Sequence, residues 1–377
     1  MTLIQAGTVV VDGEVCRPGW VHVAGRRIVA CGGGDPPVPV DVDLPNSVVV
    51  PGFVDMHVHG GGGSSFTDPA TAEQAVEFHR RHGTTTMLAS LVTAVPTDLI
   101  DAVRVLAKAT HQGTVAGIHL EGPWLSAARC GAHDHTALRA PDATEIEALL
   151  AAADGTIRMV TLAPELPGSE WAIRRFVQAN IVVAVGHTNA TYQQTRHALA
   201  LGATVGTHLF NAMPPLDHRD PGPVLALLAD PRVTVELIAD GVHLHPDVVA
   251  AVIAAVGPER VAVITDATAA AGCGDGEFRL GSLPIVVNAG VATVRGTSTI
   301  AGSTAAMDQL FAAVARGSGL NAAVRTTSAT PARALGFDGV GAIKAGWRAN
   351  LVVLEADLRV KAVMADGQWV PGLSAVC

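Results

Sequence analysis

The chain has 377 residues, of which 49% are hydrophobic and 16% are charged. This composition fits a compact globular enzyme and excludes a disordered chain. The formal net charge is −9 and the lysines are only Lys108, Lys344 and Lys361, which argues against nucleic-acid binding because a phosphate backbone needs clustered positive charge. A small anionic substrate is compatible with this charge, since a local arginine can outweigh distant charges that are screened beyond about 8 Å.

Membrane and secretion signals are missing from the sequence pattern. No apolar run reaches the roughly 18 residues that suggest a membrane span, and residues 1–5 lack the basic region and apolar core of a secretion signal. The five cysteines are odd in number, scattered and without a CxxC pair, so neither a disulfide framework nor a zinc ribbon is expected. We therefore expect a cytoplasmic enzyme that binds neither membranes nor nucleic acid.

In chain order, short β-type runs with hairpin-like glycines occur first near the N-terminus and again near the C-terminus. Each end is too small to form a good core alone. We expect residues 1–50 and 341–377 to pack together as one discontinuous β-sandwich domain. The β-type runs are at residues 7–13, 21–28, 350–354 and 361–367.

Between these ends, in residues 51–340, eight apolar runs alternate with segments of helical character. The runs are rich in Val, Ile, Thr and Ala and show little polar alternation, as expected for parallel strands buried on both faces. One helix start is marked by Asp142 with Glu145 three residues later, which is a typical N-terminal capping pattern. Strands are expected near 48–56, 84–90, 114–120, 157–163, 181–186, 203–208, 233–239 and 261–265. Helices are expected at 69–82, 96–110, 141–150, 168–180, 189–201 and 245–256.

Eight such units predict an α/β fold, a TIM-like (β/α)8 barrel, in which the active site forms at the carboxyl ends of the strands. Residues 276–296 are expected to form a hairpin insertion, and residues 302–336 the closing helices.

Polar residues end five of the eight apolar runs. His57 and His59 are two residues apart, so they point to the same side of a strand and can bind one ion together. A lone histidine at a strand end is more often a satisfied core residue than a ligand, but five strand ends with the same chemistry argue against chance. The other four positions are Glu121, His187, His208 and Asp266.

This set has the chemistry of a metal-dependent hydrolase. Zinc and similar ions bind imidazole nitrogen and carboxylate oxygen and leave one position open for water, whose pKa falls to about 7 when it is bound. Glu121, His187 and His208 form one metal set. His57 and His59 either complete a second site with Glu121 as a bridge or support a single site. Asp266 is placed to accept a proton and pass it to a leaving amine, or alternatively caps the following turn.

The motifs resemble the amidohydrolase superfamily and, within it, the N-acetylglucosamine-6-phosphate deacetylases. The most specific motifs are HLEGPW at residues 119–124 and HLFNAM at 208–213, whereas PGFVD at 51–55 marks only the superfamily. The resemblance covers nearly the whole chain. It implies hydrolysis of the acetamide of N-acetyl-D-glucosamine 6-phosphate to D-glucosamine 6-phosphate and acetate, with one or two divalent ions per subunit. Zinc is expected first, with Fe, Mn, Co, Ni or Cd as alternatives.

The resemblance also implies roles for individual residues. Glu121, His187 and His208 would bind metal, and Asp266 would be the general base and acid. The phosphate would be bound by a site shared across a homodimer interface. The implied substrate contacts are Asn211 and Ala212 to the sugar, Arg219 and His243 to the phosphate, His133 to the sugar end, and the Ile300-Ala301-Gly302 turn along the pocket.

Several alternatives stay open at this point. Arg219 suits a phosphate through its planar guanidinium, yet from the residues alone it could equally be a solvated arginine. Cys130 is either an incidental loop thiol or a modulator of the site. The substrate could be N-acetylgalactosamine 6-phosphate or another N-acyl amine. A non-catalytic barrel would be expected to show a damaged ligand set, which this chain does not.

Overall fold

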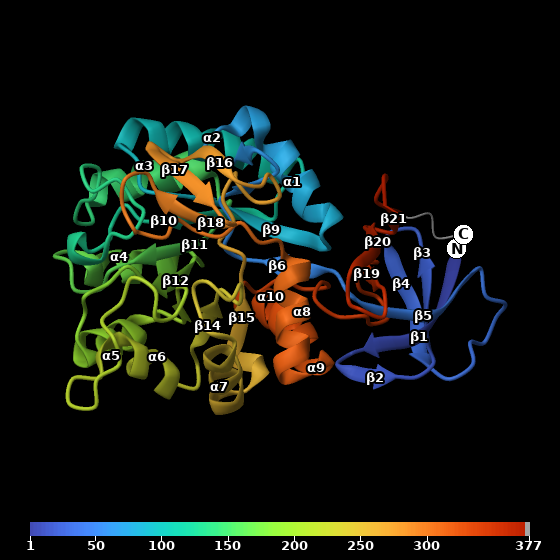
Figure 1. The fold of residues 1–377 in the computed structure, drawn as a ribbon. Helices are drawn as coiled ribbons and strands as arrows, with labels where there is room; N and C mark the ends of the chain where they lie inside the picture. Colours follow the sequence, from blue (N-terminus) through green and yellow to red (C-terminus); the bar gives the residue numbers. More distant parts are fainter. Residues whose placement is uncertain (374–377) are drawn as a thin grey trace.

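The computed structural model describes residues 1–373, so Cys377 lies outside the described residues. The chain forms a large barrel of strands and helices with a smaller β domain beside it, and the smaller domain contains both the first and the last strands of the described chain (Figure 1). Among the described cysteines, Cys16, Cys31, Cys130 and Cys273 are free thiols. No helix within residues 1–373 is both long and apolar enough to cross a membrane.

The smaller domain confirms that the two ends of the chain fold together. Its strands are β1 Thr2–Val11, β2 Glu14–Cys16, β3 Gly19–Ala24, β4 Arg27–Gly33, β5 Val42–Pro51, β19 Leu351–Leu354, β20 Val360–Ala365 and β21 Gln368–Trp369. They pair in the order β21-β20-β19-β5-β1-β3-β4, with β2 beside β1. Hydrogen bonds thus join N-terminal and C-terminal strands in one mixed sheet, in which β5 is parallel to β1 and antiparallel to β19.

The larger domain contains the eight parallel strands that the apolar runs predicted. They are β6 Phe53–Asp55, β9 Thr84–Leu91, β10 Gly117–Glu121, β11 Ile157–Leu162, β12 Val182–Val185, β13 Val205–Gly206, β14 Thr234–Leu237 and β15 Val261–Val263. Each pairs with its neighbour in this order. The first expected strand, 48–56, is divided between β5 and β6. Gly52 separates them at a close approach, where a Cβ atom would lie 2.2 Å from Thr85 Oγ1. We propose a domain boundary there and near residue 341.

Hydrogen bonds beyond the strand ends close the ring between the first and last strands. The backbone N–H of Asp266 donates to the carbonyl of His57 at 2.9 Å, and that of His59 donates to Ala267 at 2.8 Å. Beneath them, the Thr265 hydroxyl donates to Asp55 Oδ2 at 2.6 Å. Burial outweighs these hydrogen bonds and raises the pKa of Asp55 to about 7.

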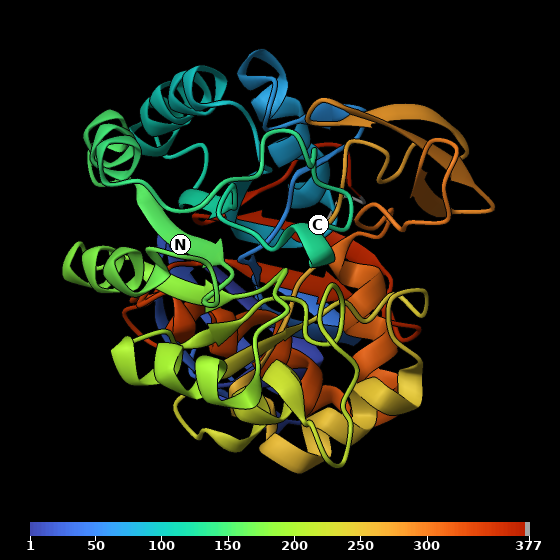
Figure 2. The same cartoon turned by 90° about the vertical axis from the view of Figure 1, so that its left-hand side faces the viewer.

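Helices surround the strands in the end-on view, and an antiparallel hairpin layer projects from the rim (Figure 2). The helices are α1 Ala72–Arg81, α2 Pro96–His111, α3 Ala143–Ala153, α4 Ser169–Gln178, α5 Tyr192–Leu201, α6 Gly222–Ala229, α7 Pro246–Val256, α8 Met307–Ser318, α9 Leu320–Val324 and α10 Thr330–Ala334. The rim layer is β16 Gly276–Leu280, β17 Leu283–Asn288 and β18 Val291–Val294, and a short pair, β7 Gly60–Gly61 and β8 Ser64–Ser65, follows β6. The Asp142 side chain accepts the N–H of Glu145 at 3.0 Å, as the capping pattern predicted.

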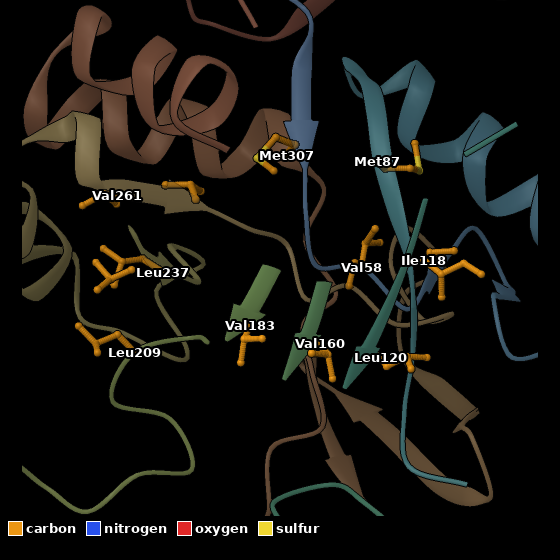
Figure 3. Close-up of a cluster of buried hydrophobic side chains, with 14 of the residues drawn as sticks. Val58, Met87, Ile118, Leu120, Val160, Val183, Leu209, Leu237, Val261 and Met307 are labelled. Atoms are coloured by element: carbon orange, nitrogen blue, oxygen red, sulfur yellow. The ribbon is translucent and has the colours of Figure 1, made fainter. Parts of the chain in front are cut away.

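The main core lies between the barrel strands and the helices around them. Figure 3 shows side chains such as Val160 and Val183 from adjacent strands within this layer, together with Leu237 and Met307. All four are fully buried. Successive side chains of a strand point to opposite faces. The residues between these outward apolar side chains therefore face the barrel interior, and the polar residues described next lie at the end of that interior.

Candidate metal centre and substrate cavity

The polar residues at the five strand ends meet at one point, as the barrel prediction required. Glu121 is the last residue of β10, while the other residues lie two to four positions beyond their strands. Among these, His187, His208 and Asp266 have left-handed backbone conformations, with φ of 45°, 25° and 48°. Such conformations cost about 1–3 kcal/mol each and occur where a side chain must be directed to a functional position.

One half of the centre brings together the first and last barrel strands. His59 Nε2 lies 3.1 Å from Glu121 Oε2 and 3.2 Å from Asp266 Oδ1. His57 Nε2 is 3.2 Å from His59 Nε2 and 3.4 Å from both carboxylates. These four residues are buried, and their ligand atoms could all contact one ion.

The other half shares Glu121 with the first. Glu121 Oε1 is 3.1 Å from the Nε2 atoms of both His187 and His208, which are themselves 3.0 Å apart. His133 also joins this group, because its Nε2 lies 3.3 Å from Glu121 Oε2. Glu121, His133 and His187 therefore form a second buried group that could hold a metal. The motifs implied only a substrate contact for His133.

The close packing of imidazoles and carboxylates shifts their pKa values. Burial disfavours the charged form of His59, but its hydrogen bonds to Asp266 and Glu121 outweigh burial and raise its pKa to about 9. Burial likewise opposes ionisation of Asp266, but the charge of His57 and the hydrogen bond from His59 lower its pKa to about 2. By contrast, burial lowers the pKa of His133 to about 4. Asp266 is thus ionised and His133 neutral at pH 7.

The donor set fits a divalent cation. Converging imidazole nitrogens and carboxylate oxygens are the ligands that zinc and similar ions bind. The Nε2 atoms of His187 and His208 lie 3.0 Å apart. A nitrogen lone pair can point at another nitrogen at this distance only if a proton or a cation lies between the two atoms. The two groups therefore indicate divalent metal binding, with Glu121 shared between them.

A cavity of about 290 Å³ opens onto the centre. Its lining includes the predicted substrate residues Asn211, Ala212, His243, Ile300 and Gly302, as well as His133. Sequence reasoning missed Leu280 of the rim layer and Ile238 after β14, which also line the cavity. Nothing but their place beside motif residues could have indicated them.

Three predicted positions lie outside this lining. Ala301 is fully buried, and its backbone N–H donates to the carbonyl of Ala292. Arg219 is exposed in its loop, where its N–H is bonded to the Asp217 carboxylate. Cys130 is half-buried, one residue before Gly131, which does line the cavity. Within one chain, then, the structure brings neither Arg219 nor Cys130 into the cavity.

A polar layer beneath the centre was largely missed from the sequence. His119, which was left out of the predicted metal set, is buried and lies between the Ser90 and Thr161 hydroxyls at 2.9 Å each. Glu236 is fully buried in β14 and contacts His57. The signal for Glu236 was present, since it is the single charge within the apolar run 233–239.

Comparison with known proteins agrees with this geometry. Residues 48–370 match the model of the amidohydrolase family. A crystal structure of N-acetyl-D-glucosamine-6-phosphate deacetylase from Mycobacterium smegmatis has a TM-score of 0.96 and 52% identity, covering 98% of this chain and 100% of that chain. Another structure of that enzyme, a variant with an aspartate replaced by alanine, is in complex with N-acetyl-D-glucosamine-6-phosphate and matches with the same identity and TM-score over 98% of this chain and 99% of that one.

Curated relatives point in the same direction. An N-acetylgalactosamine-6-phosphate deacetylase of Escherichia coli O157:H7 is 36% identical over 88% of this chain and 90% of its own length. An N-acetylglucosamine-6-phosphate deacetylase of Bacillus subtilis (strain 168) is 31% identical over 97% of this chain and 96% of its own. The chain belongs to the amidohydrolase family and, within it, to the N-acetylglucosamine-6-phosphate deacetylases, which confirms the resemblance read from the motifs.

The raised pKa of His59 predicts how metal affinity depends on pH. With a pKa of about 9, the metal-free imidazole is protonated at pH 7 and must lose that proton to bind a cation. Affinity should therefore rise with pH up to at least about pH 9, by up to about tenfold per unit for each proton released. Titration of metal-free protein with Co²⁺ at several pH values measures this. An affinity independent of pH would contradict the prediction.

Proposed function

We infer that the protein is a metal-dependent deacetylase that hydrolyses the acetamide of N-acetyl-D-glucosamine 6-phosphate to D-glucosamine 6-phosphate and acetate. The observation that carries this inference is the buried group of histidines and carboxylates, drawn from five strand ends and opening onto a cavity of about 290 Å³. Family membership supplies the reaction class. The M. smegmatis deacetylase in complex with N-acetyl-D-glucosamine-6-phosphate supports the choice of substrate.

The metal ligands proposed are Glu121, His187 and His208 on one side and His57 and His59 on the other, with one or two ions per subunit. Zinc is proposed first because it accepts this mixture of imidazole and carboxylate ligands, with Fe, Mn, Co, Ni or Cd as alternatives. A bound divalent ion supplies Lewis-acid chemistry, which polarises a carbonyl oxygen and makes a water molecule more acidic.

Asp266 is proposed as the general base and acid. Its Oδ1 lies at the centre, 3.2 Å from His59 Nε2, and the residue also lines the cavity. Because its pKa is about 2, it enters the reaction as a carboxylate that can accept a proton from the attacking water. It then delivers this proton to the nitrogen of the leaving amine, so that the C–N bond breaks without expelling an amide anion.

The cavity wall suits a phosphorylated sugar. His243 Nδ1 is 2.8 Å from Asp240 Oδ2, and although burial opposes it, this hydrogen bond raises the pKa of His243. An imidazolium favoured in this way attracts a phosphate. We assign Asn211 and Ala212 to the sugar and His133 to the sugar end. The turn at residues 300–302 contributes Ile300 and Gly302 to the wall, with Ala301 supporting it from below.

Arg219 is proposed to act across a homodimer. It lies outside the cavity of its own chain and on an exposed loop, which leaves it free to contact the phosphate in a neighbouring subunit. Cys130 is proposed as a modulator only through the loop that carries Gly131 and His133, since its thiol does not line the cavity. A cytoplasmic location remains our expectation for this enzyme.

A second candidate substrate is N-acetylgalactosamine 6-phosphate. The observation that favours it is the 36% identity with a deacetylase of that sugar from E. coli O157:H7. The two sugars differ only in the configuration of one hydroxyl group. A site built to hydrogen-bond that hydroxyl would separate them by their kcat/KM ratio.

The first test is amine release from N-acetylglucosamine 6-phosphate, from its galactose epimer and from the unphosphorylated sugar, each with and without chelator. We expect chelator-sensitive release that depends on the 6-phosphate and is faster with the glucose configuration. Faster release from the epimer would favour the second candidate. No release from any of them, with metal verified as bound, would keep the fold but overturn the proposed function.

Asp266→Asn should reduce kcat at least about a hundredfold while substrate binding is kept, because general acid–base transfer contributes roughly 10²–10⁴-fold. Steady-state kinetics on metal-loaded protein, with metal content measured in the same samples, provide the test. Asp275→Asn is the matched control, since Asp275 is fully exposed and bonded to the backbone of Ala289 and Gly290. Activity of Asp266→Asn within tenfold of wild type would rule out the acid–base role.

Arg219→Ala should raise KM for the phosphorylated sugar and leave kcat nearly unchanged, because it removes an interaction made equally in ground and transition states. If the phosphate site is shared between two subunits, a second result is expected. Mixed dimers of Arg219→Ala and Asp266→Asn subunits should regain wild-type KM in one site, which combines an intact Asp266 with an intact Arg219 from the other subunit. Mixed dimers that keep the raised KM would place Arg219 in its own subunit's site or outside it.

A further inference from the structure

Glu236 is a buried carboxylate directly behind the metal centre, and none of the roles assigned so far involves it. It lies in β14, which contributes no predicted ligand, and its side chain is fully buried. Its Oε2 is 3.1 Å from His57 Nδ1 and accepts the backbone N–H of His208 at 3.2 Å. Its Oε1 has no hydrogen-bond partner among the described residues.

A buried carboxylate lowers the stability of the fold, so its presence here suggests a functional role. Burying a carboxylate away from water costs several kcal/mol, roughly, and well-packed neutral side chains are often no less stable at such positions. A buried oxygen without a donor adds to this cost. The energetics therefore favour a role that needs the negative charge, and the nearest group that could use it is the His57 imidazole.

The geometry of His57 shows what the charge does. A carboxylate accepts hydrogen bonds, so the contact at 3.1 Å places the proton on Nδ1. The other nitrogen, Nε2, faces His59, Glu121 and Asp266, and it presents its lone pair to them once a cation takes the place of the proton on it. A carboxylate behind a metal-binding histidine fixes its tautomer and ring orientation and makes the imidazole a stronger ligand.

The other histidines of the centre have weaker partners. His59 Nδ1 faces the carbonyl of Ser90, and His187 Nδ1 faces the carbonyl of Arg129. His133 Nδ1 pairs with the Thr93 hydroxyl, and His208 Nδ1 has no partner among residues 1–373. Among the histidines of the centre, and within those described residues, only His57 has a carboxylate behind it. The effect of Glu236 should therefore be concentrated on one side of the centre.

We propose that Glu236 is a positioning residue that holds His57 in its Nδ1–H tautomer and thereby strengthens divalent-cation binding on the His57–His59–Asp266 side. It contacts the other side only through the His208 backbone, so the ligand atoms of His187 and His208 do not depend on it. The inference rests on the proposed metal centre. It adds a third carboxylate, from β14, to Glu121 and Asp266, which are already assigned to the site.

The test measures cation affinity rather than turnover. Metal-free wild type, Glu236→Gln, His57→Asn and the double variant are titrated with Co²⁺ against a competing chelator, and bound metal is counted. Glu236→Gln should weaken binding by about 10–100-fold, as loss of such partners typically does. In the His57→Asn background the same substitution should have no further effect, because its target is gone.

Two further variants keep the result interpretable. Glu145→Gln is the matched control, since Glu145 is a largely buried carboxylate that pairs with Arg139 away from the centre, and it should bind Co²⁺ as wild type does. If Glu236→Gln does not fold, Glu236→Asp keeps the charge but withdraws it by one methylene, and it should show the same selective loss. Unfolding of the metal-free variants in urea shows whether each is folded.

Unchanged affinity in Glu236→Gln, or an equal loss with and without His57, would overturn the role of Glu236 while leaving the deacetylase intact. Failure of wild type to bind any divalent cation would instead overturn the proposed metal centre itself, and with it this inference. A merely structural role predicts lower stability in urea without the dependence on His57.

Discussion

The closure of the barrel between its first and last strands is the constraint on which the centre depends. His57 and His59 come from the first strand and Asp266 from the last, more than 200 residues away in the sequence. They meet because the Asp266 N–H donates to the His57 carbonyl and because Thr265 donates to the buried Asp55 carboxylate below. An opened seam would separate the proposed general base from two proposed metal ligands while leaving every other strand pair in place.

Closure also brings many ionisable side chains together away from water, and the polar layer beneath them orients the histidines among them. Five imidazoles and the carboxylates of Glu121 and Asp266 lie within a few ångströms of one another and largely away from water. The group that contacts the outer ring nitrogen of a histidine determines which nitrogen faces the centre. Carbonyls of Ser90 and Arg129 do this for two of them, and a carboxylate does it for His57. The inward donors are thereby set in advance, and an arriving cation need not reorganise them.

The sequence allowed the fold and most of the centre to be predicted for one physical reason. Parallel strands in a barrel place all their carboxyl ends at one face, so polar residues at the ends of separate apolar runs must lie near one another. His133 escaped this logic because it lies on a loop, and only the structure shows its Nε2 beside Glu121. Glu236 escaped it because it lies inside a strand, where its charge was the only signal.

Boundaries were harder to predict than strands. The apolar run 48–56 reads as one strand, but periodicity cannot show that its two halves belong to different sheets. The division at Gly52 follows from a tertiary contact with Thr85, which lies more than 30 residues away. Arg219 illustrates a different limit, because the partner of a residue proposed to act across subunits cannot be found within a single chain.

The wall of the cavity and Asp266, the proposed general base, form a single structural unit. Ser303 N–H donates to the Asp266 carbonyl at 2.8 Å, and the Ser303 hydroxyl donates to that of Thr265 at 2.6 Å. Gly302 lies so close that a Cβ atom there would be 2.6 Å from the Asp266 carbonyl. These contacts hold Asp266 in its left-handed conformation, whose strain of about 1–3 kcal/mol must be offset locally. The turn that lines the cavity therefore also directs the side chain that we propose for proton transfer, so we expect a change in this turn to alter catalysis as well as binding.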